Sequence, residues 1–186
     1  MKRLAAVLAL GLAISGTLGA QEQGWFVTAQ AGVADYETTQ KTGRGFFGET
    51  DDDSFAWAVG LGYDFNRNIG VRGMFERSTD HATTNLCPPN AVCPAILIRE
   101  DTDFTNWSVV AMPRLPLGSR TNLYGTFGLQ YWDADGGPQL PGDDDVEFLF
   151  GGGLEFSLTP HLAIGGEAQA SAADYLAGRF VVRYSF

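Results

Sequence analysis

The residues of this sequence that could carry chemistry are few, because it contains only two cysteines and two histidines. Cys87 and Cys93 bracket a short segment that begins with Pro88 and Pro89. In an exported chain, such a pair is expected to form a disulfide. The rival interpretation is a metal site that adds His81, but two thiols and one distant imidazole fall short of a tetrahedral ligand set. The sequence therefore predicts a disulfide and no metal site here.

The two histidines do not indicate a catalytic site. His81 is expected in a loop and His161 in a short turn, and neither has a nearby serine placed for hydrolysis or acyl transfer. The sequence therefore predicts a protein that is not an enzyme.

Acidic residues gather in clusters between the regular segments of the sequence. The simplest interpretation is a solvated loop surface, and the second is a set of carboxylates that bind Ca²⁺ or Mg²⁺. No stretch has the calcium-loop pattern of an EF-hand, and no other cofactor is expected. The clusters are Glu49 with Asp51 to Asp53, Glu100 with Asp101 and Asp103, Asp133 with Asp135, and Asp143 to Asp145.

Residues 1–20 have the pattern of a secretory signal peptide. Lys2 and Arg3 precede an apolar or small run from Leu4 to Ile14, and small residues lead up to Ala20. The alternative, a retained membrane anchor, is disfavoured because the run is short for a span of ~20 residues. We therefore expect a cleaved signal peptide over 1–20 and a single domain over 21–186.

The charge of the chain restricts its partners. The formal net charge is -10, and removal of Lys2 and Arg3 leaves 10 basic against 22 acidic residues, or -12. Nucleic acid is therefore not an expected partner. Residues 21–186 contain no apolar run of ~18 residues, so any membrane crossing in this region would have to use strands.

Apolar residues alternate with small or polar ones along most of the remaining sequence, and this period of two is typical of β-strands. Eight segments show it, each near the ~9–11 residues that cross a bilayer at a tilt. Their apolar positions run through Val27 to Val33, Trp57 to Phe65, Ile69 to Phe75, Trp107 to Pro113, Leu123 to Tyr131, Phe148 to Phe156, Leu162 to Ala170 and Phe180 to Phe186.

The links between these segments alternate in length. Short links are expected at Asn66 to Asn68, Gly118 to Arg120 and Thr159 to His161. Long ones are expected at Asp35 to Ser54, Thr79 to Asp103 and Asp133 to Asp145, with a briefer one near Ser171 to Asp174. Bacterial outer-membrane barrels have short periplasmic turns and longer outer loops.

Hydrocarbon offers no partner to a free peptide group, so a membrane sheet must close on itself. The sequence predicts an all-β fold, an eight-stranded antiparallel up-and-down transmembrane β-barrel whose bulky residues face lipid. A soluble sandwich is the alternative. Two aromatic belts are expected at the headgroup levels: Trp25, Tyr63, Phe65, Phe156, Tyr184 and Phe186 at one rim, and Phe55, Trp57, Phe75, Tyr131 and Phe148 at the other.

Charged residues on the inward phase of the alternation form the candidate site. They are Arg72, Glu76, Glu155, Glu167, Arg179 and Arg183, with Asp64 and Arg114 nearer one rim. Enclosed charges are costly unless paired, so a network of ion pairs that plugs the lumen is expected. The alternative is a gated ion path, for which the inward glycines Gly60, Gly62, Gly128, Gly151, Gly153 and Gly165 would leave room.

Several stretches resemble the small OmpA/OmpX-type outer-membrane barrels. They are WSVVAMPRLPL from Trp107, NLYGTFGLQYW from Asn122, GGGLEF from Gly151 and FVVRYSF from Phe180. The last is similar to the signal that this family presents to the barrel-assembly machinery, which the resemblance places on Phe180, Val182, Tyr184 and Phe186. The sequence has no peptidoglycan-binding segment after Phe186, so wall anchoring is not expected.

The sequence and the resemblance together predict a monomer in the bacterial outer membrane, reached by Sec-type export through the periplasm. The expected role is passive: membrane structure and contact with a host or surface ligand through the acidic loops. Outer-membrane lipid and lipopolysaccharide are the expected surroundings. A narrow ion or small-solute channel is the first alternative, and a lipid A-modifying enzyme the second.

Overall fold

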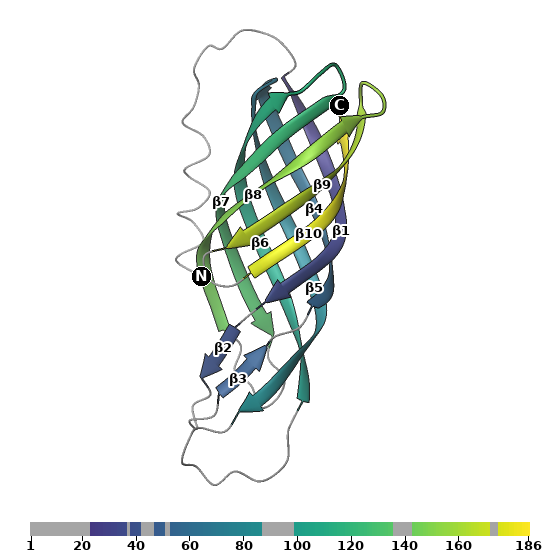
Figure 1. The fold of residues 1–186 in the computed structure, drawn as a ribbon. Helices are drawn as coiled ribbons and strands as arrows, with labels where there is room; N and C mark the ends of the chain where they lie inside the picture. Colours follow the sequence, from purple (N-terminus) through teal and green to yellow (C-terminus); the bar gives the residue numbers. More distant parts are fainter. Residues whose placement is uncertain are drawn as a thin grey trace.

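The computed structural model describes residues 23–36, 38–41, 47–50, 53–86, 99–135, 143–171 and 175–186. These residues form ten β-strands and the turns between them (Figure 1). The strands are β1 (Gly24–Tyr36), β2 (Thr38–Lys41), β3 (Phe47–Thr50), β4 (Asp53–Asn66), β5 (Ile69–Leu86), β6 (Arg99–Pro116), β7 (Thr121–Asp135), β8 (Asp143–Ser157), β9 (Leu162–Ser171) and β10 (Tyr175–Ser185). Within these ranges there is no helix of the length and hydropathy needed to span a membrane.

Eight of the strands close into an antiparallel barrel. β1 pairs with β4 on one side and with β10 on the other, and the pairing of β5 with β6 completes the ring. Each barrel strand therefore has two hydrogen-bonded neighbours, and successive barrel strands lie side by side. Closure leaves no barrel strand with a free edge. The predicted eight-stranded up-and-down architecture is confirmed.

Three tight turns and both ends of the described chain lie at one end of the barrel, here called the short-turn end. The Asn66 side chain accepts hydrogen bonds from the amides of Asn68 (2.8 Å) and Ile69 (3.0 Å) and fixes the β4–β5 turn. Thr159 accepts bonds from the amides of His161 (3.3 Å) and Leu162 (3.0 Å) in the β8–β9 turn. The positions predicted for the three short links are confirmed.

At the opposite, long-loop end, strand pairing continues further than the sequence predicts. β5 and β6 each contain 18 residues, and they stay paired past a bulge as far as Thr84 and Arg99. Figure 1 shows β2 and β3 beyond this end of the barrel; they pair with each other, and β3 pairs with β5.

The loops predicted at Asp35 to Ser54 and Thr79 to Asp103 are therefore wrong in part. Each contains paired strand: β2 and β3 in the first, and the ends of β5 and β6 in the second. The reason is physical, because strands that leave hydrocarbon no longer need an apolar face and lose the alternation that identifies them.

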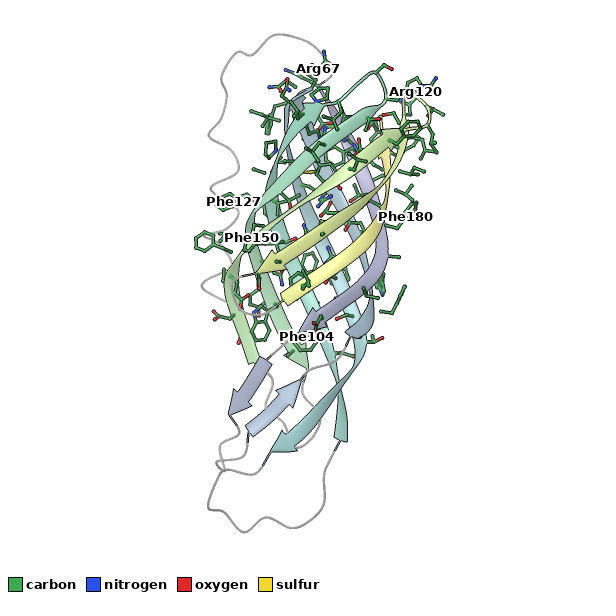
Figure 2. The ribbon with its side chains drawn as sticks, viewed as in Figure 1. Arg67, Phe104, Arg120, Phe127, Phe150 and Phe180 are labelled. Atoms are coloured by element: carbon green, nitrogen blue, oxygen red, sulfur yellow. The ribbon has the colours of Figure 1, made fainter. Side chains whose placement is uncertain are left out.

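The two faces of the barrel wall differ as the alternation predicts. Large apolar side chains on the outer face are exposed, with Phe127 at 61% and Trp107 at 57%. Figure 2 shows Phe127 and Phe150 projecting from the wall. Exposed apolar side chains over a whole barrel surface are expected only where lipid is the solvent.

Aromatic rings meet on the outer wall near each end. Near the short-turn end, Trp25 and Tyr63 lie 5.2 Å apart between ring centroids, and Tyr184 and Phe186 lie 5.5 Å apart. Toward the long-loop end, Phe75 contacts Trp57 (5.7 Å) and Trp107 (4.7 Å), and Phe127 stacks on Phe148 (6.3 Å). Rings at two levels are typical of interfacial belts.

Candidate functional site

Among the described residues, the buried charged side chains are four arginines and four carboxylates, and all point into the barrel lumen. They are Arg72, Arg114, Arg179 and Arg183 against Asp64, Glu76, Glu155 and Glu167. The set is neutral in sum and includes all six predicted network residues and both rim residues. The eight form three layers along the barrel, named here the lower, middle and upper layers from the short-turn end.

The lower layer joins Asp64, Arg114, Glu155 and Arg183. One carboxylate oxygen of Asp64 lies 2.7 Å from a guanidinium nitrogen of Arg114 and forms an ion pair with it. The other carboxylate oxygen forms a second ion pair with Arg183. Arg183 also contacts Glu155 at 3.3 Å. The Phe26 ring faces both guanidinium groups, with its centroid 4.0 Å from the Arg183 Cζ and 5.4 Å from the Arg114 Cζ. An ion-pair network with cation–π contacts thus joins β1, β4, β6, β8 and β10 across the lumen at this level.

The middle layer is a bidentate ion pair between Arg72 of β5 and Glu167 of β9. The two guanidinium nitrogens of Arg72 donate to the two carboxylate oxygens at 2.9 and 2.6 Å. Tyr124 of β7 donates a further hydrogen bond of 2.7 Å to the same carboxylate. Both charged side chains are at most 1% exposed, and parallel N–H···O bonds of this kind have well-defined geometry.

The upper layer centres on the ion pair between Glu76 and Arg179. Glu76 also accepts hydrogen bonds from Tyr175 (3.0 Å) and Asn106 (3.1 Å). Arg179 donates a 2.7 Å bond to Gln169. Neutral side chains from β6, β9 and β10 therefore complete the coordination of this pair, as burial requires.

Apolar side chains fill the lumen above the upper layer. The buried members at this end include Ala34, Ala56, Phe104, Ala134, Leu149 and Ala177, and Phe104 packs against Trp132 at 6.3 Å between centroids. Trp132 donates a 2.9 Å hydrogen bond to Glu147, which also accepts a 2.6 Å bond from Ser171. The long-loop side of the lumen is thus packed with side chains.

Three inward glycines hold large neighbours instead of leaving open space. A Cβ at Gly62 would meet the Phe26 ring, a Cβ at Gly153 would lie 2.5 Å from the Tyr124 hydroxyl, and one at Gly60 would lie 2.6 Å from the Thr28 hydroxyl. At Gly128, Gly151 and Gly165 the neighbouring strand's main chain occupies that position. Protein atoms therefore occupy the space beside all six glycines, and the ion path stays an alternative prediction.

Sequence reasoning missed the neutral partners of the charges. Tyr124, Tyr175, Asn106 and Gln169 hold the middle and upper layers, and Phe26 the lower one. All five lie on the inward phase of their strands. The phase alone could have found them, but aromatic residues in a membrane strand are readily assigned to the lipid face.

The structure describes only some of the other residues that the sequence singled out. Phe180, Tyr184 and Phe186 are exposed on the outer wall, with Val182 between them at intermediate exposure; their role in assembly stays a prediction. Cys87 and Cys93 lie outside the described residues, as does the segment 1–20, so the disulfide and the signal peptide also stay predictions.

The metal-binding hypothesis gains no support from the described part of the chain. Among its residues, no three potential ligands gather as a metal ion would require, and the Ca²⁺ or Mg²⁺ hypothesis stays a prediction. His161 is exposed in the β8–β9 turn, where its Nδ1 lies 3.0 Å from the main-chain oxygen of Ser185. The side chain of His81 lies outside what the structure describes.

Solved structures with the same fold cover nearly the whole chain. The attachment invasion locus protein Ail of Yersinia pestis is 20% identical, with 90% of this chain and 100% of that chain covered and a TM-score of 0.53. OprG of Pseudomonas aeruginosa is 12% identical (88% and 96% covered, TM-score 0.58). A major outer membrane protein of Thermus thermophilus is 12% identical (89% and 100% covered, TM-score 0.59).

Comparison by sequence gives the family. No curated protein matches the chain. The family described as outer membrane protein beta-barrel domain matches residues 4–181, most of the 186-residue sequence. The closed antiparallel barrel and its apolar outer face fit that match. The chain belongs to the outer membrane β-barrel domain family.

Proposed function

We propose that this protein is a non-conducting barrel of the bacterial outer membrane, with a structural role and an acidic outer surface that binds partners. The observation that supports the first part is the set of three successive layers of ion pairs within the lumen. An eight-stranded barrel is only wide enough for its interior to be filled by side chains. An ion that crossed this lumen would have to separate each layer in turn.

Conductance across a planar lipid bilayer tests this part of the proposal. We expect purified, refolded protein to give no discrete current steps over a range of voltages. Steps whose amplitude changes in a Glu76→Gln variant would contradict the proposal, because that substitution alters only a lumen side chain. Heat-dependent migration on gels serves as the control that each sample is a folded barrel.

The long-loop end supports the second part of the proposal through its charge. Its described strand residues include thirteen acidic positions against three basic ones, Lys41, Arg77 and Arg99. The acidic positions are Asp35, Glu49, Asp53, Asp80, Glu100, Asp101, Asp103, Asp133, Asp135, Asp143, Asp144, Asp145 and Glu147. In outer-membrane barrels this end faces the outside of the cell. A surface with a large excess of one charge sign favours partners of the opposite sign and raises their association rate.

One structural neighbour fits a surface role, since Ail is described as an attachment invasion locus protein. We extend from it only the general idea of attachment, and we assign the partner from the charge of this chain. A cationic protein or polymer surface is therefore the proposed partner of the long-loop end.

Binding of lipid nanodiscs to an immobilised polycation tests the surface role. We expect discs that carry the protein in neutral lipid to bind, and binding to fall when Asp101, Asp103, Asp144 and Asp145 are all replaced by Asn. The matched control is Arg67→Gln with Arg120→Gln at the opposite end, which should leave binding unchanged. Equal binding by the two variants would overturn the assignment of the surface.

A narrow channel is kept as the second candidate because some buried polar atoms have no protein partner. Among the described residues these include Thr126 Oγ1, Gln130 Nε2 and Arg72 Nε. Buried polar atoms of this kind are commonly hydrated, and a file of water is the minimum that ion passage needs. The bilayer recording above decides between the two candidates. No catalytic role is proposed, and the lipid A-modifying enzyme gains no support from the exposed position of His161.

A further inference from the structure

The mouth of the barrel at the short-turn end is a cavity of about 610 Å³. Its walls are residues of the three short turns, and its floor includes Asp64, Arg114, Glu155 and Arg183 of the lower layer. A volume of this size lies within the range of small-molecule sites.

Each of the three turns brings one basic residue to this cavity. Arg67 comes from the β4–β5 turn, Arg120 from the β6–β7 turn and His161 from the β8–β9 turn. Figure 2 shows Arg67 and Arg120 at this end of the barrel. The sequences of the turns contain no acidic residue. Within the described ranges, neither Arg67 nor Arg120 has an ion pair.

The carboxylates of the floor are already engaged. Asp64 pairs with both Arg114 and Arg183, and Glu155 pairs with Arg183. Four arginines therefore line the cavity against two side-chain carboxylates, so the charged side chains of its lining have two positive charges in excess. This excess occurs in a chain whose formal net charge is -10, so it is local to the mouth.

We infer that this basic mouth binds the phosphate group of an anionic ligand. Guanidinium groups recognise phosphate through pairs of parallel N–H···O bonds. Arg67 and Arg120 are exposed and reach the cavity from separate turns, while Ser119 and Asn122 add neutral donors to its wall. The ligand is either a soluble phosphate compound of the periplasm or the headgroup of a lipid in the adjoining leaflet.

Amide NMR shifts on titration with inorganic phosphate test the inference, with the full barrel in maltoside micelles, which contain no phosphate. We expect saturable shifts at cavity residues such as Asn122 and Ser157. In Arg67→Gln with Arg120→Gln the apparent affinity should fall about tenfold or more, because the loss of even one of the two charge-assisted contacts predicts a change of this size. The matched control, Arg77→Gln, removes an exposed arginine at the long-loop end and should change nothing.

A second arm distinguishes the two sources of phosphate. Nanodiscs of phosphatidylglycerol and of phosphatidylcholine are compared without added phosphate. Shifts at Asn122 and Ser157 that appear only in the anionic discs would assign the site to a lipid headgroup, and their absence there would assign it to a soluble ligand.

Three outcomes would overturn the inference. They are a phosphate titration without saturable shifts, equal shifts in the double variant and in the wild type, and anionic-disc shifts confined to outward residues such as Trp25 and Tyr184. The last would show that the arginines contact the membrane surface outside the cavity. The two substituted residues lie in exposed turns, so a normal spectrum for the rest of the barrel verifies that the double variant folds.

Discussion

At the short-turn end, tight turns carry Arg67, Arg120 and His161 and no acidic residue, whereas the described strands at the long-loop end carry thirteen acidic residues against three basic ones. Between the ends, the lumen charges cancel, four against four. The comparison shows where the membrane constrains the sequence. Inside the wall a charge needs a partner, because an unpaired one is costly to bury. Beyond the wall, water permits an excess of either sign, and each end acquires a charge of its own.

The largest predicted effect is a loss of stability when one partner of a buried lumen ion pair is removed. Glu167→Ala should lower the free energy of unfolding by about 3–5 kcal/mol, because Arg72 stays buried without its carboxylate. Equilibrium unfolding in urea measures the change. Arg72→Met with Glu167→Gln should recover most of the loss, since no net charge is then left unpaired. If the single and double variants are equally unstable, the pair is not what sets the cost.

A smaller effect is predicted where an inward glycine holds an aromatic ring. Gly62→Ala should destabilise the barrel by about 1–3 kcal/mol, because the new Cβ meets the Phe26 ring, which contacts Arg183 and Arg114 of the lower layer. The control is Gly178→Ala on the outer wall, where a Cβ has no neighbour within 4 Å. The same unfolding assay compares them, and equal stability of the two variants would mean that the lumen is less tightly filled than described.

The smallest effect is predicted at the long-loop end, where like charges are neighbours. Asp133 and Asp144 are directly paired across β7 and β8, and both are exposed. Asp133→Asn should stabilise the protein by about 0.2–1 kcal/mol by removing this repulsion. The gain should shrink as salt is added, because exposed charges are screened. A gain that is independent of salt would point to a cause other than charge.

The sequence predicts most of the barrel because hydrocarbon imposes a rule on every residue it touches. Alternation identified the eight wall strands and the inward phase of Arg72, Glu167 and the other lumen charges. It did not reveal β2, β3 or the ends of β5 and β6, which lie where the rule no longer applies.

The pairing of the lumen charges was also beyond the sequence. Arg72 and Glu167 are 95 residues apart and belong to β5 and β9, which are not neighbours in the sheet. Which charges meet across the lumen depends on strand tilt and on the register at closure. The alternation shows whether a side chain faces lipid or the lumen. It does not show at which height that side chain lies relative to residues of a strand across the lumen.

The central claim is that successive residues of a barrel strand face two different environments, lipid outside the wall and packed side chains inside it. Two tryptophans test this claim directly. Trp107 is outward and 57% exposed, while Trp132 on the neighbouring strand is inward and bonds to Glu147. They lie at almost the same height, since Asn106 pairs with Trp132 and Trp107 with Tyr131. Single-tryptophan variants in bilayers with brominated acyl chains report contact with lipid. Strong quenching of Trp107 with little quenching of Trp132 is the predicted result, and equal quenching of the two would contradict the account.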